Sequence, residues 1–415
     1  MVSYKQFVEE AMRSYSSLPT EPNDLYKKYY IDIPITVDGD HADAQKHAAA
    51  VEAMASSMEQ RTMIKFDAIV SDCCAKSINP SVRIVRPQQL DPVLLDNKLF
   101  KSSEDKLAAF SNANSKYFVM IDAVGGKPVK FNLLLINEGN FSVQVVVNAA
   151  ENSKVGIVEI CASSGKGTMA VLNEISAKQG AEVELDVLHN ENEGTDVASL
   201  CKAVAAEKSK VRVSLVFTGG RLTRSKNIID ASGIGSEVDV SEIAFGSAEQ
   251  KFDLGTSMTN TTAMSTARLE SGTVLDGKAQ CMLKGYAKVP KGAKGCLSRI
   301  TERGILLSKD AHVDALPDMS IDYSNEVKAT HSAATAPIDK EALFYLMSRG
   351  LEEEKARRVF ITAFMARYLS NMKDGLASEV AMSIMLEKLE RGTFGVMPDV
   401  TTRGVWMASR PEGSR

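Results

Sequence analysis

The sequence predicts a mainly β protein whose core is a parallel β-helix, with helical regions on either side of it. From about residue 115 to 335, short β-branched segments with alternating polarity follow one another, and each is closed by Gly, Asn, Asp or Ser. The segments "SGTVLDG", "AQCMLKGYAKVPKGAKGC" and "GILLSKDAHVDALPDMSI" resemble successive rungs with small residues at the corners. In a solenoid, each such coil buries its inward face against the next coil.

Two other architectures compete with the β-helix. A doubly wound α/β sheet needs a helix between successive strands, and only residues 195–208 read as such a helix. A large antiparallel sandwich remains possible from strand content alone. The spacing of the rungs favours the solenoid over the sandwich.

The chain is expected to divide into three parts, with the β-helix core at 115–335. Residues 1–114 are predicted to form an N-terminal helical region, which includes an Ala-rich helix over 41–60. Residues 336–415 are predicted to form a C-terminal helical domain. Pro337 and Asp339 open its first helix, and apolar residues recur at helical spacing in "LEEEKARRVFITAFMARYLSNM".

Composition excludes several functional classes. The 415 residues are 44% hydrophobic and 25% charged, and the net charge of −4 gives no basic footprint for nucleic acid or an anionic membrane. No run of about 18 apolar residues is present, so no membrane span is expected. The N-terminus does not read as a signal peptide, which predicts a cytoplasmic protein. The six cysteines form no CxxC pair and are expected to be free thiols.

The stretch "ASSGKGTMA" (162–170) superficially resembles a phosphate-binding loop. A true P-loop has four residues between its first glycine and the Gly-Lys pair, and this stretch does not. It is interpreted as a corner of the solenoid, so the chain is not expected to bind nucleotide. No catalytic triad or paired-carboxylate motif is present either, which predicts a protein that is not an enzyme.

One stretch resembles a known family. Residues 304–351, "GILLSKDAHVDALPDMSIDYSNEVKATHSAATAPIDKEALFYLMSRGL", contain an LLS strand, an acidic turn, a proline and a second strand. A lysine, a histidine and a small-residue run follow, and then an "FYL-SRG" helix. This order is similar to that of the SufB/SufD family, the scaffold proteins of iron–sulfur cluster assembly. Weaker similarity extends from about residue 135 to about 390.

The resemblance implies a right-handed β-helix and two kinds of partner. In the family, the C-terminal helices dock a SufC-like ABC ATPase, and the β-helices of two SufB/SufD chains pair edge to edge. A transient iron–sulfur cluster is thought to form near that contact, within a homodimer or a heterodimer of paralogues. The expected ATPase-binding residues lie on the two helices after the core; they are Phe344, Tyr345, Arg349, Phe360 and Phe364.

Four residues are candidates for holding iron, a cluster or sulfur. His331 matches the family histidine, although a histidine at this seam could equally be buried and hydrogen-bonded to backbone. Cys296 lies in a Gly-rich corner where Lys294 and Arg299 would favour its thiolate, and it could also be a plain rung residue. Glu302 and Asp314 could supply oxygen ligands, but charged residues near turns are usually only solvated.

The chain departs from the SufB pattern at two positions. Where SufB has a cysteine before the LL strand and a glutamate after the histidine, this chain has Arg303 and Ser332. That arrangement is SufD-like. Two other functions therefore remain open: an inert protein–protein adaptor that binds no cluster, and a carbohydrate-active β-helix enzyme. The absence of an obvious aromatic groove disfavours the enzyme.

Overall fold

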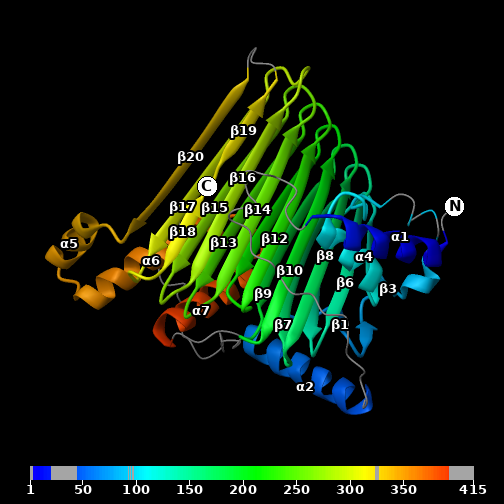
Figure 1. Ribbon diagram of the computed structural model, residues 1–415, viewed down its shortest axis with the longest axis horizontal. Coiled ribbons are helices and arrows are strands. Elements are labelled where there is room, and N and C mark those ends of the chain that lie inside the picture. Colours follow the sequence, from blue (N-terminus) through cyan, green and yellow to red (C-terminus); the bar gives the residue numbers. More distant parts are fainter. Residues whose placement is uncertain are drawn as a thin grey trace.

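The computed structural model describes residues 3–19, 44–91, 93, 95, 98–322 and 327–391. Two long sheets face each other and form a parallel β-solenoid of about eight turns, with helices at both ends (Figure 1). The predicted β-helix core is therefore confirmed, and the antiparallel sandwich is excluded. All strand pairs are parallel except β1–β2 and β3–β4 at the first coil.

From β4 to β18, successive strands along the chain belong alternately to the two sheets. The first sheet has the order β2-β1-β5-β7-β9-β11-β13-β15-β17-β20, and the second has the order β18-β16-β14-β12-β10-β8-β6-β4-β3, with β19 also paired to β16. The strands of the first sheet are β1 Ala68–Ser71, β2 Ala75–Ser77, β5 Val129–Asn137, β7 Lys154–Ser163, β9 Glu182–Asn190, β11 Lys210–Phe217, β13 Glu237–Gly246, β15 Thr266–Leu275, β17 Leu297–Leu306 and β20 Lys328–Pro337. Those of the second are β3 Val82–Val85, β4 Tyr117–Ala123, β6 Phe141–Ala149, β8 Gly167–Ala177, β10 Thr195–Ala205, β12 Leu222–Ala231, β14 Lys251–Asn260, β16 Gln280–Val289, β18 His312–Ala315 and β19 Asp318–Ile321.

Parallel in-register pairing stacks equivalent residues of successive coils. Glu159 pairs with Val187, and Val187 pairs with Leu215, so one coil takes 28 residues here (187 − 159 and 215 − 187). Side chains alternate between the two faces of a strand, so every second residue points into the solenoid. These inward rows, rich in Val, Leu and Ala, form the inner core between the sheets.

Helices cover the outer faces of both sheets. The six described α-helices are α1 Tyr4–Ser17, α2 Ala44–Thr62, α4 Lys106–Asn114, α5 Lys340–Ser348, α6 Glu353–Leu369 and α7 Gly375–Arg391. Helices α2, α6 and α7 share a buried apolar cluster with the outer face of the first sheet. Helix α4 and Phe100 pack on the outer face of the second sheet.

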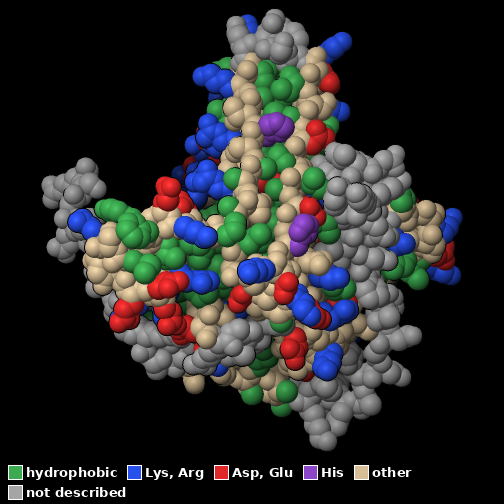
Figure 2. Space-filling model, turned by 60° about the vertical axis from the view of Figure 1, so that its left-hand side comes forward, with side chains coloured by type: hydrophobic (Ala, Val, Ile, Leu, Met, Phe, Trp, Pro, Cys, Tyr) green, Lys and Arg blue, Asp and Glu red, His purple; other side chains and the backbone are tan. Residues whose placement is uncertain are grey.

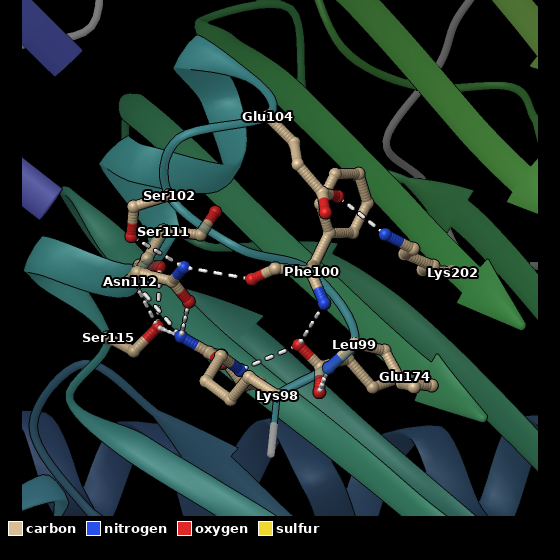
Figure 3. Close-up of polar contacts among 12 residues, drawn as sticks. Lys98, Leu99, Phe100, Ser102, Glu104, Ser111, Asn112, Ser115, Glu174 and Lys202 are labelled. Carbon is tan, nitrogen blue, oxygen red and sulfur yellow. Dashed lines mark hydrogen bonds and ion pairs between the residues drawn. The ribbon is translucent and has the colours of Figure 1, made fainter. Parts of the chain in front are cut away.

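The segment before α4 is fastened to the second sheet by buried polar contacts (Figure 3). The Lys98 ammonium lies 2.7 Å from the carboxylate of Glu174, and both side chains are buried. Backbone N–H groups of Leu99 and Phe100 donate to the same carboxylate at 3.2 Å. A buried charge is tolerated when it is paired and hydrogen-bonded, and this network meets both conditions.

Helix α6 approaches the first sheet closely because Gly272 has no side chain. A Cβ atom at Gly272 would lie 2.3 Å from the ring of Tyr368. The Tyr368 hydroxyl donates to the carbonyl of Ser271 at 3.3 Å, and Arg367 contacts the carboxylate of Glu270 with two nitrogens. The C-terminal helices are thus seated on strand β15, two strands from β20.

One secondary-structure prediction is wrong, because residues 195–205 form strand β10 and not a helix. The predicted N-terminal helical region contains α1, α2 and α4, and β1, β2 and β3 within it extend the two sheets. The division at 114/115 and 335/336 stays a prediction, although α4 ends at Asn114 and β20 ends at Pro337.

Other predictions are confirmed or lie outside the described residues. Residues 164–166 form a corner between β7 and β8, as interpreted for the decoy loop. The predicted helix at 41–60 is α2, which is described from Ala44 onward. In the described part of the chain, no helix is long and apolar enough to cross a membrane.

Candidate functional site

The final strand of the first sheet, β20, has an open edge. It pairs with β17 on one side, and no described strand pairs with its other side. All ten of its residues, Lys328–Pro337, are exposed or half-exposed, and most are Ala, Thr or Ser. An unpaired strand offers a row of N–H and C=O groups to another chain. The end of the solenoid is therefore a template for pairing.

His331 lies on this strand, in register with Ile300 of β17. Ile300 belongs to the inner core, and in-register parallel neighbours point to the same face, so His331 also points inward. No further coil covers it, and the side chain is exposed. Figure 2 shows this end of the solenoid, where hydrophobic side chains and histidine lie between columns of backbone. The alternative of a buried histidine is wrong.

Glu302 lies on β17, the strand next to the open edge strand β20, and is fully buried. It pairs with Ala333, two residues beyond His331, and faces inward. Its carboxylate accepts a 2.6 Å hydrogen bond from the backbone N–H of Gly285, and its second oxygen has no partner. Burial raises the pKa of Glu302 to about 8, with a smaller contribution from the Glu242 carboxylate. Glu302 is thus not a solvated turn residue.

Cys296 lies at the corner before β17 and is buried. It packs against Val289 and Ala293, with Val327 alongside. Burial raises the pKa of its thiol, so the expected stabilisation of its thiolate by Lys294 is wrong. The Cys296 carbonyl accepts from the N–H of Lys328, three residues before His331. Because Leu297 pairs with Lys328, Cys296 is level with Val327, four residues before His331. At about 3.3 Å per residue, the two candidates are about 13 Å apart along the strand direction.

Asp314 lies in the second sheet, on its outward face. It is on β18, where its neighbour Val313 pairs with the inner-core residue Cys281, so Asp314 points outward. Its carboxylate lies 3.2 Å from the ring of His312. Among the described residues, the clusters of at least three potential ligand atoms within 4.8 Å include none of His331, Cys296, Glu302 and Asp314. The predicted ligands therefore do not converge within one chain.

The predicted ATPase-binding residues fall into two groups. Phe344 and Tyr345 on α5 are 72% and 59% exposed, and the guanidinium of Arg349 lies 5.7 Å from the centre of the Tyr345 ring. Phe360 and Phe364 on α6 are half-buried and pack against the apolar cluster over the first sheet. Only the α5 group presents an apolar surface.

A second group of potential metal-ligating side chains lies inside the solenoid, and the sequence analysis did not predict it. Cys161 and His189 are paired in register on β7 and β9, and Glu191 follows β9. All three are fully buried. Burial, together with the nearby Glu191 and Glu159 carboxylates, raises the pKa of the Cys161 thiol. The 28-residue coil length was the signal that could have placed Cys161 beside His189.

A third cluster lies near the first coil. The thiol of Cys73 donates to the carboxylate of Glu138 at 2.8 Å, and Asp72 lies close by. Burial, with the hydrogen bond to Glu138, raises the pKa of Cys73 to about 12. This thiol is therefore held in its neutral form.

Comparison with known proteins agrees with this architecture. The family described as "SUF system FeS cluster assembly, SufBD core domain" matches residues 135–364, which is more than half of the chain. The match runs from the end of β5 through the following coils to strand β20, α5 and most of α6.

Individual relatives carry the same description. The chain is 26% identical over 301 residues to the iron–sulfur cluster assembly protein SufD of Bacillus subtilis, covering 70% of this chain and 68% of that protein. It is 26% identical over 297 residues to an iron–sulfur cluster assembly SufBD family protein of Pyrococcus horikoshii, covering 70% and 66%. It is 28% identical over 167 residues to SufD of Escherichia coli, covering 40% and 39%. The chain therefore belongs to the SufBD family of SUF-system iron–sulfur cluster assembly proteins.

Proposed function

We propose that this chain is a scaffold and adaptor subunit of a SUF-type iron–sulfur cluster assembly complex. The observation that carries the proposal is the open strand β20, which presents His331 at an uncovered end of the solenoid. Family membership and the printed names of the relatives support the same role. The chain works by holding partners and cargo, and ATP hydrolysis belongs to a partner subunit.

The first partner is another SufBD chain that pairs with β20. Its edge strand adds to the open edge, and the two inner faces then meet at the junction. The partner is either a second copy or a paralogue. Seven of the ten residues of β20 are Ala, Ser or Thr, and such small side chains suit the addition of a second strand at this edge.

The cargo is a nascent iron–sulfur cluster held at that junction. His331 supplies an imidazole ligand, and the partner chain supplies the thiolates, because the described thiols of this chain do not lie beside His331. Glu302 lies beneath the rim as a buried carboxyl that a bound cation would ionise. A cluster needs soft ligands, so a single chain is expected to hold it poorly.

Anaerobic reconstitution with iron and sulfide tests the cargo. The wild-type chain, mixed with a cysteine-bearing SufBD paralogue, is expected to give the visible absorption of a cluster. His331→Ala should reduce that absorption at least severalfold. His312→Ala is the matched control, since His312 is an exposed histidine on the outward face of β18. Equal absorption for all three proteins contradicts the assignment of His331.

The second partner is a SufC-like ABC ATPase that docks on α5. Phe344 and Tyr345 form an exposed apolar pair, with Arg349 beside them for an acidic or aromatic contact. Helix α5 leads into α6, which rests on β13 and β15 through Tyr368. A movement of the docked ATPase would thus be transmitted through α5 and α6 to strands β13 and β15, close to the open end of the solenoid.

Co-purification with a SufC-like ATPase tests this surface. Phe344→Ala combined with Tyr345→Ala should abolish capture of the ATPase. Val124→Ala is the control, because Val124 is 75% exposed and lies at a corner before β5. Retention of the ATPase by the double variant contradicts docking on α5.

An inert adaptor without cluster binding is the second candidate. The observation that favours it is that the four predicted ligands do not converge, since Asp314 points outward and Cys296 is buried at a corner. It predicts that the partners assemble normally while no cluster absorption appears with any paralogue.

The compartment is proposed to be the cytoplasm. All six cysteines are free, and that state fits a reducing environment.

A further inference from the structure

Cys161, His189 and Glu191 form a cluster inside the solenoid. Their potential ligand atoms, one from each residue, all lie within 4.8 Å of one another. Cys161 and His189 come from neighbouring strands β7 and β9, which run side by side in Figure 1. The cluster lies five strands from β20, which at about 4.8 Å per strand is about 24 Å from the rim.

Two atoms of the cluster are buried without a hydrogen-bond partner. Nδ1 of His189 lies 2.6 Å from Oε1 of Glu191, while Nε2 of His189 and Oε2 of Glu191 contact no donor or acceptor. Most buried polar side-chain atoms in folded proteins have a partner, and an orphan often marks an unplaced ion or water. A simple His–Glu ion pair explains the first contact but leaves both orphan atoms unexplained.

The ring of His189 is held in a fixed orientation. It stacks on Phe217 of the next coil, with ring centres 5.1 Å apart and planes 10° from parallel. Cys161, His189 and Phe217 occupy one inward row of the first sheet. An imidazole that is clamped in this way is oriented for a ligand before the ligand arrives.

We propose that Cys161, His189 and Glu191 bind a divalent transition-metal ion of the zinc or ferrous type inside the solenoid. The donor set of one sulfur, one imidazole nitrogen and one carboxylate oxygen suits these ions. A thiolate and a carboxylate carry two negative charges, which a divalent ion neutralises within an apolar core. Metal binding requires the Cys161 and Glu191 side chains to rotate until the three ligand atoms lie at the usual metal distances of about 2.0 to 2.3 Å.

The ion would join two coils of the solenoid and serve a purpose separate from the cargo site at β20. Because the cluster is closed off from solvent, the ion enters while the chain folds. It is therefore expected to persist through purification and to resist brief exposure to a chelator.

Cobalt substitution tests the proposal, since Co²⁺ bound to a thiolate gives an intense ligand-to-metal absorption in the near ultraviolet. The full-length protein is produced in medium with Co²⁺ as the added transition metal. Cys73 and Cys74 are replaced by serine in every sample to remove the other thiol-containing cluster. About one Co²⁺ per chain with the thiolate absorption is expected.

Variants assign the ligands. Cys161→Ser should abolish the thiolate absorption, and His189→Gln or Glu191→Gln should lower the bound metal at least about tenfold. Cys281→Ser is the matched control, because Cys281 is an equally buried inward cysteine on β16 and should keep both signals. Circular dichroism checks that each variant is folded, and His189→Gln preserves the test if Cys161→Ser does not fold.

Metal analysis of protein from unsupplemented medium then identifies the native ion as zinc or iron. The proposal is overturned if folded wild-type protein holds no metal after the chelator, or if the thiolate absorption persists in Cys161→Ser. It is also overturned if an experimental structure shows only water between His189 and Glu191.

Discussion

His331 on the last strand stands directly in register with Ile300 on the strand before it. Ile300 is fully buried, while His331, which points to the same face, is exposed. The inner wall of the solenoid therefore continues for one strand beyond the point at which its core is covered. A histidine at this place costs little desolvation in the single chain, and the proposed pairing of another chain with β20 would enclose it.

Truncating His331 should barely change the stability of the folded chain, whereas truncating Ile300 should lower it strongly. His331→Ala is expected to change the free energy of unfolding by less than about 0.5 kcal/mol, because the side chain is exposed. Ile300→Ala should cost about 2 to 5 kcal/mol through the cavity it leaves. Urea unfolding of the isolated chain measures both. A large loss from His331→Ala would mean that the histidine packs within the single chain.

Gly272 sets the distance between α6 and the solenoid. Gly272→Ala places a methyl group against the ring of Tyr368, and it should destabilise the protein by about 1 to 3 kcal/mol. Gly156→Ala is the control, since its Cβ would meet only Lys130 at 3.8 Å in the same sheet. Equal unfolding midpoints for the two variants would show that α6 does not rest on β15.

Glu242 makes stability depend on pH. Burial raises its pKa from 4.5 to about 7, although Ser271 and Thr256 donate hydrogen bonds that act in the opposite direction. The folded chain therefore holds this proton more tightly than the unfolded chain. The resulting stabilisation is complete below about pH 4.5 and is lost as pH rises through about 7.

Glu242→Gln should remove this dependence. Relative to wild type, the variant should gain about 2 to 3 kcal/mol of stability between about pH 5 and about pH 8. Glu182→Gln, at an exposed ion pair with Lys154, should follow the wild-type curve. Unfolding curves across this pH range provide the measurement, and parallel curves for Glu242→Gln and wild type would contradict the raised pKa.

The two aromatic groups after the core should respond differently to truncation. Phe344→Ala is expected to leave the unfolding midpoint nearly unchanged, because the ring is exposed on α5. Phe364→Ala should lower it, since that ring packs on the first sheet and lies 5.2 Å from the Tyr368 ring, centre to centre. If Phe344→Ala were the more destabilising change, α5 would be a packed helix and not a docking surface.

The fold was largely predictable because a solenoid repeats one local pattern. The alternation of inward apolar residues and the small corner residues identified β15 to β19 without knowledge of their partners. Strand β10 was missed because Ala, Leu and Lys in "TDVASLCKAVA" favour a helix locally. Its pairing with β8 and β12 overrides that preference, and such long-range pairing is invisible in a short window.

The sequence could predict a site residue only where a local motif marked that residue by itself. His331 could be singled out from the family pattern, but its exposure depends on β20 being the last strand. Cys296 appeared reactive because basic residues lie near it in sequence, whereas its burial is set by Val289 and Val327. Cys161 and His189 meet only through the coil length, so spacing rules for local motifs could not find them.

Amide hydrogen exchange of β20 tests most directly whether the open end of the solenoid is a pairing surface. It is measured over Lys328–Pro337 in the isolated chain at low concentration, at high concentration, and with a SufBD paralogue. Pairing predicts that exchange in β20 slows by about tenfold or more in one of the latter conditions, while α5 is unaffected. Exchange in β20 that stays equally fast in all three conditions would contradict a scaffold that assembles through this strand.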